Sequence, residues 1–264
     1  MPLASSPRII ATVRRWWTDN SARYGLLPTL KLFISTLWQF ARESTPARRR
    51  QRYGDVEYDW DFRVDTTSAT VGWRNRLQGM FHSPYQPTEP ALFREMLASL
   101  KQANPSPSSA KFDFREFTFI DIGSGKGRAL LMAADYPFRR IIGVELLPEL
   151  HRVARENIAK YKSDSQLCFA IDCLLGDARE FSFPPEPIVL YLFNPLPESG
   201  LIRMIGNLEQ SLEEHRRPVF VLYHNPLLEQ VVSRTATFKK TISTDQYSIF
   251  AVEADSHVDA SEAG

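Results

Sequence analysis

Cysteine is scarce in this sequence, and its scarcity excludes one class of protein. The 264 residues include two cysteines, Cys168 and Cys173. Two cysteines cannot build a disulfide framework, and they predict a protein of the reducing cytoplasm. The five histidines are scattered and accompany no Cys-x-x-Cys motif, so no metal site is predicted.

Long apolar runs are missing as well. No stretch of about 18 uncharged apolar residues is present, which argues against a membrane span. The N-terminus lacks a compact apolar core followed by a small-residue cleavage site, so no secretory signal is expected. An excess of one charge is also absent, because 32 Lys and Arg face 31 Asp and Glu for a net charge of +1. A wholly basic nucleic-acid-binding protein is therefore not predicted.

The charge is nevertheless uneven along the chain. Residues 1–52 contain ten Lys or Arg against two Asp or Glu, so a basic arm precedes a mildly acidic body. Two helices are predicted in the arm, over 8–17 and from Pro28 to Ser44, with tryptophans beside arginines. The arm suits docking on the body, on a second subunit or on an anionic surface such as a peripheral membrane site. Nucleic acid is not favoured, because no recognised reading module accompanies its basic residues.

The rest of the chain divides into three parts. Residues 53–88 are rich in Asp, Arg, Pro and aromatics with little helical periodicity, which is typical of a lid or substrate-binding segment. Residues 89–255 alternate apolar strands with helices, which predicts a doubly wound α/β domain with a parallel sheet covered on both faces. Residues 256–264 form an acidic tail that is predicted to be disordered. The expected strands lie at 117–122, 140–145, 166–174, 188–193, 218–223, 236–243 and 247–253, and the expected helices at 89–103, 128–136, 148–161 and 198–214.

A glycine turn follows the first of these strands. Its glycines, Gly123, Gly125 and Gly127, permit unusual backbone angles and let a ligand approach the chain closely. The next strand ends in Glu145, whose carboxylate can accept hydrogen bonds from both hydroxyls of a ribose. A dinucleotide fold would place its third glycine where this chain has Arg128. The spacing therefore disfavours a nicotinamide-dependent oxidoreductase but leaves it open.

Four motifs, in order along the chain, resemble the class I S-adenosylmethionine-dependent methyltransferases. They are Asp121-Ile-Gly-Ser-Gly-Lys-Gly-Arg128, Val144-Glu145-Leu146, Gly176-Asp177-Ala178 and Leu192-Phe-Asn-Pro-Leu-Pro197. The resemblance covers about residues 85–253 and implies S-adenosylmethionine as the cofactor. It also implies a seven-stranded Rossmann-like sheet with the last strand inserted antiparallel, here with an N-terminal helical extension. The cofactor-binding residues that it implies are Asp121, Gly123, Ser124 and Gly125 in the turn, Glu145 at the ribose, Leu146, Asp177 and Ala178 at the adenine, and Asn194.

A narrower resemblance lies upstream of the turn. Tyr85-Gln-Pro-Thr88 is similar to the cofactor-covering turn of the non-SET histone-lysine methyltransferases. Tyr85 and Thr88 are therefore candidate cofactor-binding residues, and the alternative for Thr88 is the N-cap of the following helix. Residues 45–84 do not otherwise match those enzymes, so a histone substrate is not implied. Small bacterial methyltransferases of unassigned substrate look more similar.

The acceptor side is predicted at two neighbouring strand ends. Asn194-Pro195 follows the fourth strand, and in N-methyltransferases resembling this chain such an Asn aligns the target amine. Here the motif reads Asn-Pro-Leu-Pro and not the Asn-Pro-Pro-aromatic of nucleic-acid amino methylases. The fifth strand ends in Tyr223 and His224, and His224 is the candidate base for an oxygen acceptor. The prediction is methyl transfer to a nitrogen of a protein, peptide or small amine, with O-methylation and a non-catalytic cofactor-binding scaffold as alternatives.

Overall fold

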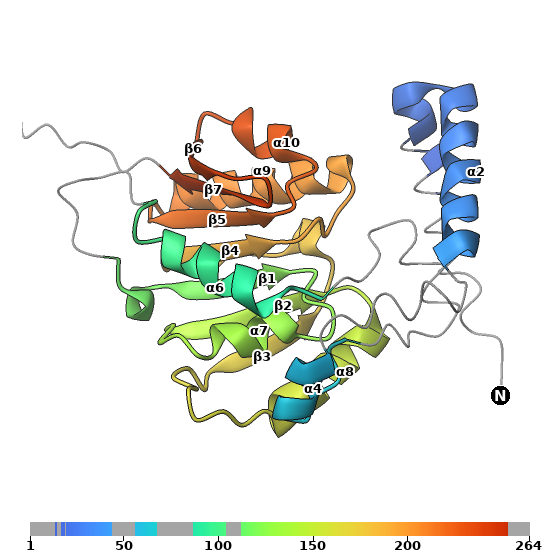
Figure 1. Cartoon of the computed structure of the whole chain (residues 1–264). Coiled ribbons are helices and arrows are strands. Elements are labelled where there is room, and N and C mark those ends of the chain that lie inside the picture. The colour runs from blue at the N-terminus through green and yellow to red at the C-terminus, as the bar shows by residue number, and fades with distance from the viewer. Residues whose placement is uncertain are drawn as a thin grey trace, which may run out of the picture.

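A seven-stranded sheet forms the centre of the protein in the computed structural model (Figure 1). The structure describes residues 14, 17, 18, 20–43, 56–67, 87–103 and 112–252, without the side chains of 36–43 and 56–57. The strand order is β3-β2-β1-β4-β5-β7-β6, with β1 to β5 parallel and β7 antiparallel to both of its neighbours. The strands are β1 (Thr118–Ile122), β2 (Arg140–Glu145), β3 (Ile171–Leu175), β4 (Ile188–Leu192), β5 (Val219–His224), β6 (Phe238–Ser243) and β7 (Tyr247–Val252). The predicted fold, including the antiparallel last strand, is confirmed.

Helices cover both faces of the sheet because the central strands are apolar on both sides. Every residue of β1, β4 and β5 is buried. Successive side chains of a strand enter opposite faces, so Phe119 joins one hydrophobic cluster and Ile120 joins the other. One face is packed by α6 (Pro90–Ser99), α7 (Arg128–Ala133) and α8 (Pro148–Lys160), the other by α9 (Glu198–Glu214) and α10 (Glu229–Ser233). Two short 3-10 helices, η1 (Phe114–Glu116) and η2 (Ala178–Glu180), complete the described part of this domain.

The structure differs from the sequence prediction in two helices. Residues 56–62 form helix α4 (Val56–Phe62) within a segment that showed no helical periodicity. This helix is seven residues long, and contacts with residues far away in the chain stabilise it. One of them joins the rings of Phe62 and Tyr161, whose centroids lie 5.2 Å apart. Helix α2 (Leu26–Glu43) begins two residues before Pro28, because a proline in a first helical turn removes no intrahelical hydrogen bond.

The edge strand β3 also differs from its prediction. It was expected over 166–174 and runs over Ile171–Leu175. The backbone N–H groups of Leu167 and Cys168 both donate to the Ala134 carbonyl at the end of α7, at 2.7 and 2.9 Å, and so do not join the ladder with β2. Apolar residues before the strand therefore belong to an irregular segment, which periodicity does not distinguish from a strand.

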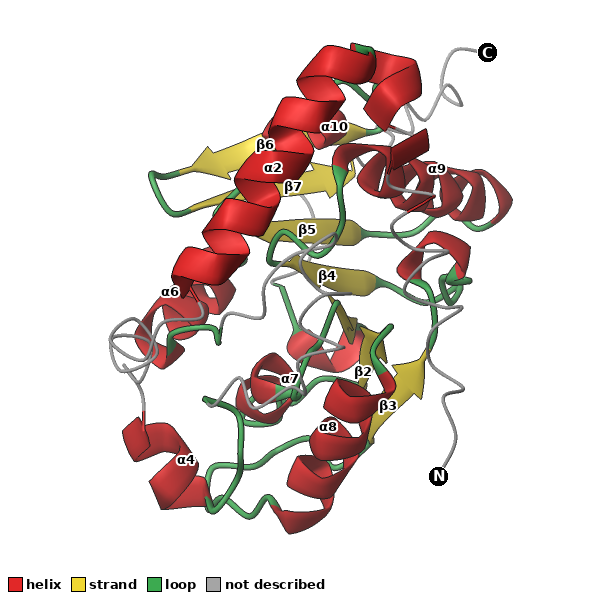
Figure 2. Cartoon of the chain, turned by 90° about the vertical axis from the view of Figure 1, so that its right-hand side faces the viewer, coloured by secondary structure: helices red, strands yellow, loops and turns green. Residues whose placement is uncertain are grey.

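Helix α2 stands on the side of the sheet toward which β5 points (Figure 1) and crosses in front of the strand ends when viewed from that side (Figure 2). An ion pair of 2.8 Å between Arg23 and Glu198 joins the segment before α2 to the first residue of α9. The N-terminal helical extension is thus present, and it lies near the carboxyl edge of the parallel strands. Among the described residues, no helix has both the length and the apolar character that crossing a bilayer requires.

Candidate cofactor and acceptor site

The glycine turn connects β1 to α7 at the carboxyl edge of the sheet. Gly123, Gly125 and Gly127 have positive φ angles of 77°, 56° and 85°, a region that favours glycine. The N–H groups of Gly123 and Ser124 donate to the Val144 carbonyl at 2.8 and 3.1 Å, which fixes the turn against β2. A Cβ atom on Gly123 would lie 2.8 Å from the Cβ atom of Pro195. The turn therefore passes close to the end of β4, where the acceptor was predicted.

Two buried carboxylates lie beside this turn. Asp121, on β1, is 4% exposed, and no side chain or backbone group in the described part of the chain donates a hydrogen bond to its carboxylate. Burial, followed by the nearby Glu145 charge, raises the pKa of Asp121 to about 8. A buried carboxylate without a donor is costly, so this group fits a cationic ligand that would donate hydrogen bonds to it.

Glu145 ends β2 and already holds the backbone around it. Its Oε2 atom accepts the Gly125 N–H at 2.8 Å, and its Oε1 atom accepts the Leu147 N–H at 2.7 Å. Burial raises the pKa of Glu145, although these N–H donors act in the opposite direction. Each carboxylate oxygen has a second lone pair, so Glu145 can still accept hydrogen bonds from ribose hydroxyls. The turn and the two carboxylates thus fit the amino-acid and ribose parts of S-adenosylmethionine.

Two of the residues predicted for the adenine, Asp177 and Ala178, lie at the start of η2. Asp177 caps this short helix by accepting the Arg179 N–H at 3.0 Å, and it also forms an ion pair with the Arg179 guanidinium. Ala178 is buried and Leu146 is half-buried. The Asp177 carboxylate therefore has a structural partner in this structure, which any contact with an adenine amino group would have to share or replace.

The predicted acceptor residues meet between β4 and β5. Asn194 adopts a left-handed backbone conformation with φ of 46°, and so does Asn225. The Asn194 Oδ1 atom accepts a hydrogen bond from the Tyr223 hydroxyl at 3.1 Å, and its Nδ2 atom donates to the Asn225 carbonyl at 2.7 Å. The side-chain amide of Asn194 is thus held in one orientation, and one lone pair of Oδ1 and one N–H remain available to a ligand.

His224 belongs to a buried chain of hydrogen bonds. Its Nδ1 atom lies 2.8 Å from the Tyr191 hydroxyl, which in turn lies 2.8 Å from the Thr88 hydroxyl. Its ring stacks on Phe193, with centroids 3.8 Å apart. Burial lowers the pKa of His224 to about 4, so the imidazole is neutral near pH 7. A neutral ring with such a low pKa is a weak base for deprotonating a hydroxyl.

Thr88 is not the N-cap of α6. That position is Glu89, which makes no side-chain capping bond, and the Thr88 hydroxyl faces Tyr191 instead. Tyr85, the other residue predicted upstream, lies outside the described residues. Within the described ranges, no group of three or more His, Cys, Asp or Glu side chains is placed to hold a metal ion.

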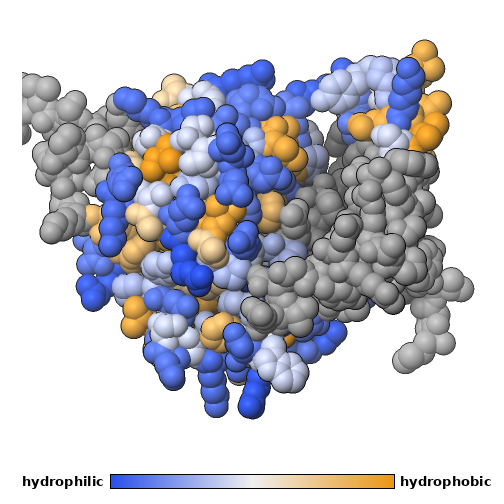
Figure 3. All heavy atoms as spheres, viewed as in Figure 1, coloured by the Kyte–Doolittle hydropathy of each residue, from blue (hydrophilic) through white to orange (hydrophobic). Residues whose placement is uncertain are grey.

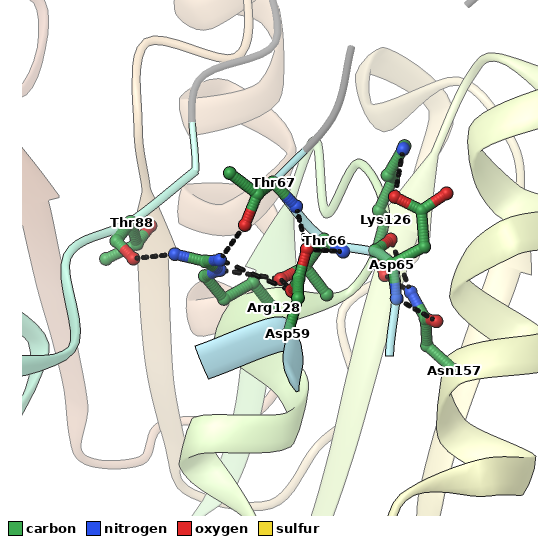
Figure 4. Close-up of polar contacts among 8 residues, drawn as sticks. All are labelled: Asp59, Asp65, Thr66, Thr67, Thr88, Lys126, Arg128 and Asn157. Carbon is green, nitrogen blue, oxygen red and sulfur yellow. Dashed lines mark hydrogen bonds and ion pairs between the residues drawn. The ribbon is translucent and has the colours of Figure 1, made fainter. Parts of the chain in front are cut away.

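The structure adds a set of contacts between the predicted lid segment, where Asp65 and Thr66 were candidate lid residues, and the glycine turn, and the sequence did not indicate these contacts (Figure 4). Residues 58–67, here called the strap, lie against the glycine turn and α7. Lys126, between two turn glycines, forms an ion pair of 2.7 Å with Asp65 of the strap. Asn157 of α8 accepts the Asp65 N–H at 2.9 Å and donates to the carbonyls of Asp65 and Lys126, both at 2.9 Å. The sequence predicted a lid over 53–88, but no motif in it showed which turn residues the strap contacts.

Comparison with known protein families gives one match. A model described as a methyltransferase domain matches residues 120–194, which include the turn, both carboxylates and Asn194. Comparison with curated proteins gave no match.

Several solved structures are similar to the chain. An RNA methyltransferase from Salinibacter ruber, in complex with S-adenosyl-L-homocysteine, is 20% identical with a TM-score of 0.40 over 66% of this chain and 99% of that one. A ribosomal protein L11 methylase from Lactobacillus delbrueckii subsp. bulgaricus is 17% identical with a TM-score of 0.39, over 60% and 75% of the two chains. The putative methyltransferase yhhF from Escherichia coli is 15% identical with a TM-score of 0.44, over 65% and 91%. Likenesses this distant assign no acceptor.

The matched segment contains the glycine turn, β2 and β4, together with most of β1. Its first residue lies in β1 and its last is Asn194. The strand order places the ends of β1, β2 and β4 next to one another at this edge. The family match, the sheet topology and the carboxylates of Asp121 and Glu145 identify this part of the chain as a class I S-adenosylmethionine-dependent methyltransferase domain.

Proposed function

We propose that the protein transfers a methyl group from S-adenosylmethionine to a nitrogen of a protein, peptide or small amine. The observation that carries this proposal is the orientation of the Asn194 amide, held by Tyr223 and Asn225 at 3.1 and 2.7 Å. When bound, the cofactor supplies a methyl group on a sulfonium, which is an already activated leaving group. The chain therefore has to position the acceptor more than to activate it.

A neutral amine suits this site better than a hydroxyl does. Its N–H groups can donate to the free lone pair of Asn194 Oδ1, which leaves the nitrogen lone pair for the new bond to carbon. A hydroxyl acceptor generally needs a base, and His224 is a poor one because its pKa is lowered to about 4 and its Nδ1 atom is bonded to Tyr191. These observations favour N-methylation over the O-methylation alternative.

The test is a methyl-transfer assay with both acceptor classes. A tryptic peptide mixture, ethanolamine and catechol would be incubated with S-adenosylmethionine, and methylated products would be located by mass spectrometry. Methylated nitrogen is expected. Products methylated at oxygen alone would favour the His224 alternative, and S-adenosylhomocysteine binding with no methylated product would favour a non-catalytic scaffold.

A matched pair of variants tests the role of Asn194. Asn194→Ala is expected to lower kcat by about 100-fold, because a misplaced acceptor is costly in rate. Asn207→Ala is the control, since Asn207 also makes a side-chain bond to a carbonyl, that of Arg179 at 2.8 Å, but lies on α9. Equal kcat values for the two variants would contradict the proposed positioning.

A further inference from the structure

We infer that Arg128 is a positioning residue that presets the glycine turn for the cofactor by clamping it to the strap. Arg128 follows Gly127 directly and is the first residue of α7. It is 2% exposed, although arginine is rarely buried without partners. The inference rests on the S-adenosylmethionine site described above and is independent of the acceptor.

The guanidinium of Arg128 is surrounded by strap residues (Figure 4). Its Nε atom donates to the Thr66 hydroxyl at 2.7 Å, and its Nη2 atom donates to the Thr67 hydroxyl at 2.6 Å. Nη2 also lies 3.4 Å from Oδ1 of Asp59, and the guanidinium carbon lies 4.9 Å from the centre of the Tyr58 ring. The charge is thus paired and hydrogen-bonded, as a buried guanidinium requires.

Asp59 gives the strap the shape that receives Arg128. Its Oδ2 atom accepts the N–H groups of Thr66 and Thr67 at 2.8 and 2.6 Å, and its Oδ1 atom accepts the Thr66 hydroxyl. The Asp59 carboxylate therefore ties the end of the strap, Thr66 and Thr67, back to α4, and it also balances the Arg128 charge. Removal of either charge would leave the other buried, so the two side chains form one unit.

The contacts of Arg128 also connect the glycine turn to the predicted acceptor side. The Nη1 atom of Arg128 lies 3.5 Å from the Thr88 carbonyl, and the Thr88 hydroxyl begins the chain to Tyr191 and His224. On the opposite side of Gly127, Lys126 is 1% exposed and is bound to Asp65. Both cationic side chains of the turn are therefore directed into the strap, while Asp121 keeps its carboxylate without a protein donor in the described part of the chain.

Two buried arginines allow a controlled experiment. Arg128→Gln would be compared with Arg217→Gln, because Arg217 is also buried but donates to Ser211 and His215 at the end of α9. Both variants are expected to lower Tm. Only Arg128→Gln is expected to weaken S-adenosylhomocysteine binding in calorimetry, by about tenfold or more, and to raise hydrogen exchange over 121–130 in the ligand-free protein.

Thr67→Val keeps the test decisive if Arg128→Gln does not fold, and a double variant tests the coupling of the charged pair if it does. Thr67→Val removes one hydrogen bond of the guanidinium and is expected to weaken binding about threefold. Asp59→Asn combined with Arg128→Gln should weaken binding little more than Arg128→Gln alone, because the residues act as a unit. Unchanged affinity and unchanged exchange in Arg128→Gln and Thr67→Val would overturn the inference. Since the readout is cofactor binding, failure to find a nitrogen acceptor would not affect it.

A separate observation concerns the surface of α2, and from it we propose that this helix docks on an anionic lipid bilayer. Four apolar side chains, Leu26, Leu27, Leu30 and Ile34, are 69%, 74%, 44% and 57% exposed. At 100° per residue they lie within about 100° of one another around the helix, so they form one stripe. Hydrophobic atoms gather over the described part of this helix in Figure 3.

Charge identifies the partner of this stripe. Lys31 borders it and is exposed, and residues 1–52 contain ten Lys or Arg against two Asp or Glu. Exposed leucines beside basic side chains match the interface of an anionic bilayer, where the apolar face enters and the charges meet lipid phosphates. Nucleic acid would match the charge but not the leucines. The position of α2 near the strand ends would bring the acceptor side of the domain to the membrane.

Vesicle sedimentation of the full chain tests this proposal. Vesicles of phosphatidylcholine with phosphatidylserine are expected to bind the protein at low salt and to release most of it at about 0.5 M salt. Leu27→Glu with Ile34→Glu should reduce binding by about tenfold or more. The control, Leu167→Glu with Phe169→Glu, adds the same charge at side chains of 59% and 78% exposure beside β3 and should change binding less than threefold. Equal losses, or no wild-type binding, would refute the proposal.

Discussion

Cofactor binding should release a proton, because Asp121 is mostly protonated in the ligand-free protein. Its pKa of about 8 leaves about one tenth of the carboxyl groups ionised at pH 7. A cationic amino group that binds there favours the ionised form, so about 0.9 proton should leave per molecule bound. Between pH 6 and pH 7 the affinity for S-adenosylhomocysteine should therefore rise close to tenfold.

Calorimetry measures this proton directly. Titrations at pH 7 in buffers of different ionisation enthalpy give the number of protons released from the slope of the observed heat against that enthalpy. Asp121→Asn is the control, since its amide does not titrate, and it should bind the ligand more weakly with no released proton. A wild-type affinity that stays constant from pH 6 to pH 7, with no proton released, would refute the reasoning.

The same pKa predicts that Asp121→Asn, which should weaken ligand binding, increases the stability of the ligand-free protein. A carboxyl whose folded-state pKa lies above its unfolded value stabilises the fold least at high pH, because only the unfolded state then ionises freely. The ligand-free variant should thus be more stable than wild type at pH 7, with a gap that widens from pH 4 to pH 8 by at most about 1.4 kcal/mol per pH unit. Urea unfolding at several pH values measures this gap, and a variant less stable than wild type at pH 7 would contradict it.

Three other perturbations follow from single contacts. Glu145→Ala should weaken S-adenosylhomocysteine binding by about tenfold or more, or about 1.4 kcal/mol in calorimetry, because it frees the Gly125 and Leu147 N–H groups as well as the ribose site. Gly123→Ala should abolish cofactor binding in the same assay, since its Cβ atom would lie 2.8 Å from that of Pro195 at a φ of 77°. The pH profile of kcat should show no ionisation of His224 between pH 6 and pH 8, because its pKa is lowered to about 4, and a group titrating near 6.5 that disappears in His224→Gln would disprove this.

Local sequence signals were sufficient to predict the sheet and the residues at the carboxyl edge of its parallel strands. The apolar runs of β1, β2, β4 and β5 were placed within one residue of their observed ends, because fully buried parallel strands are continuous in sequence. Asp121, the turn glycines and Glu145 follow from those strands, since strand ends of a parallel sheet share one edge. The contacts among Asn194, Tyr223 and Asn225 required the structure, because they join the ends of two strands that are far apart in the chain.

The strap shows why the remaining site residues were missed. Its helix α4 is too short to be stable alone and lacks an apolar stripe, so it owes its conformation to Asp59, Arg128 and the aromatic contact with Tyr161. None of these pairs is visible in sequence, because each joins residues more than 60 positions apart or depends on a side chain folding back on its own segment. The burial of Arg128 is itself visible only in the structure, and because a buried guanidinium requires a partner charge, the structure also had to identify Asp59 as that partner.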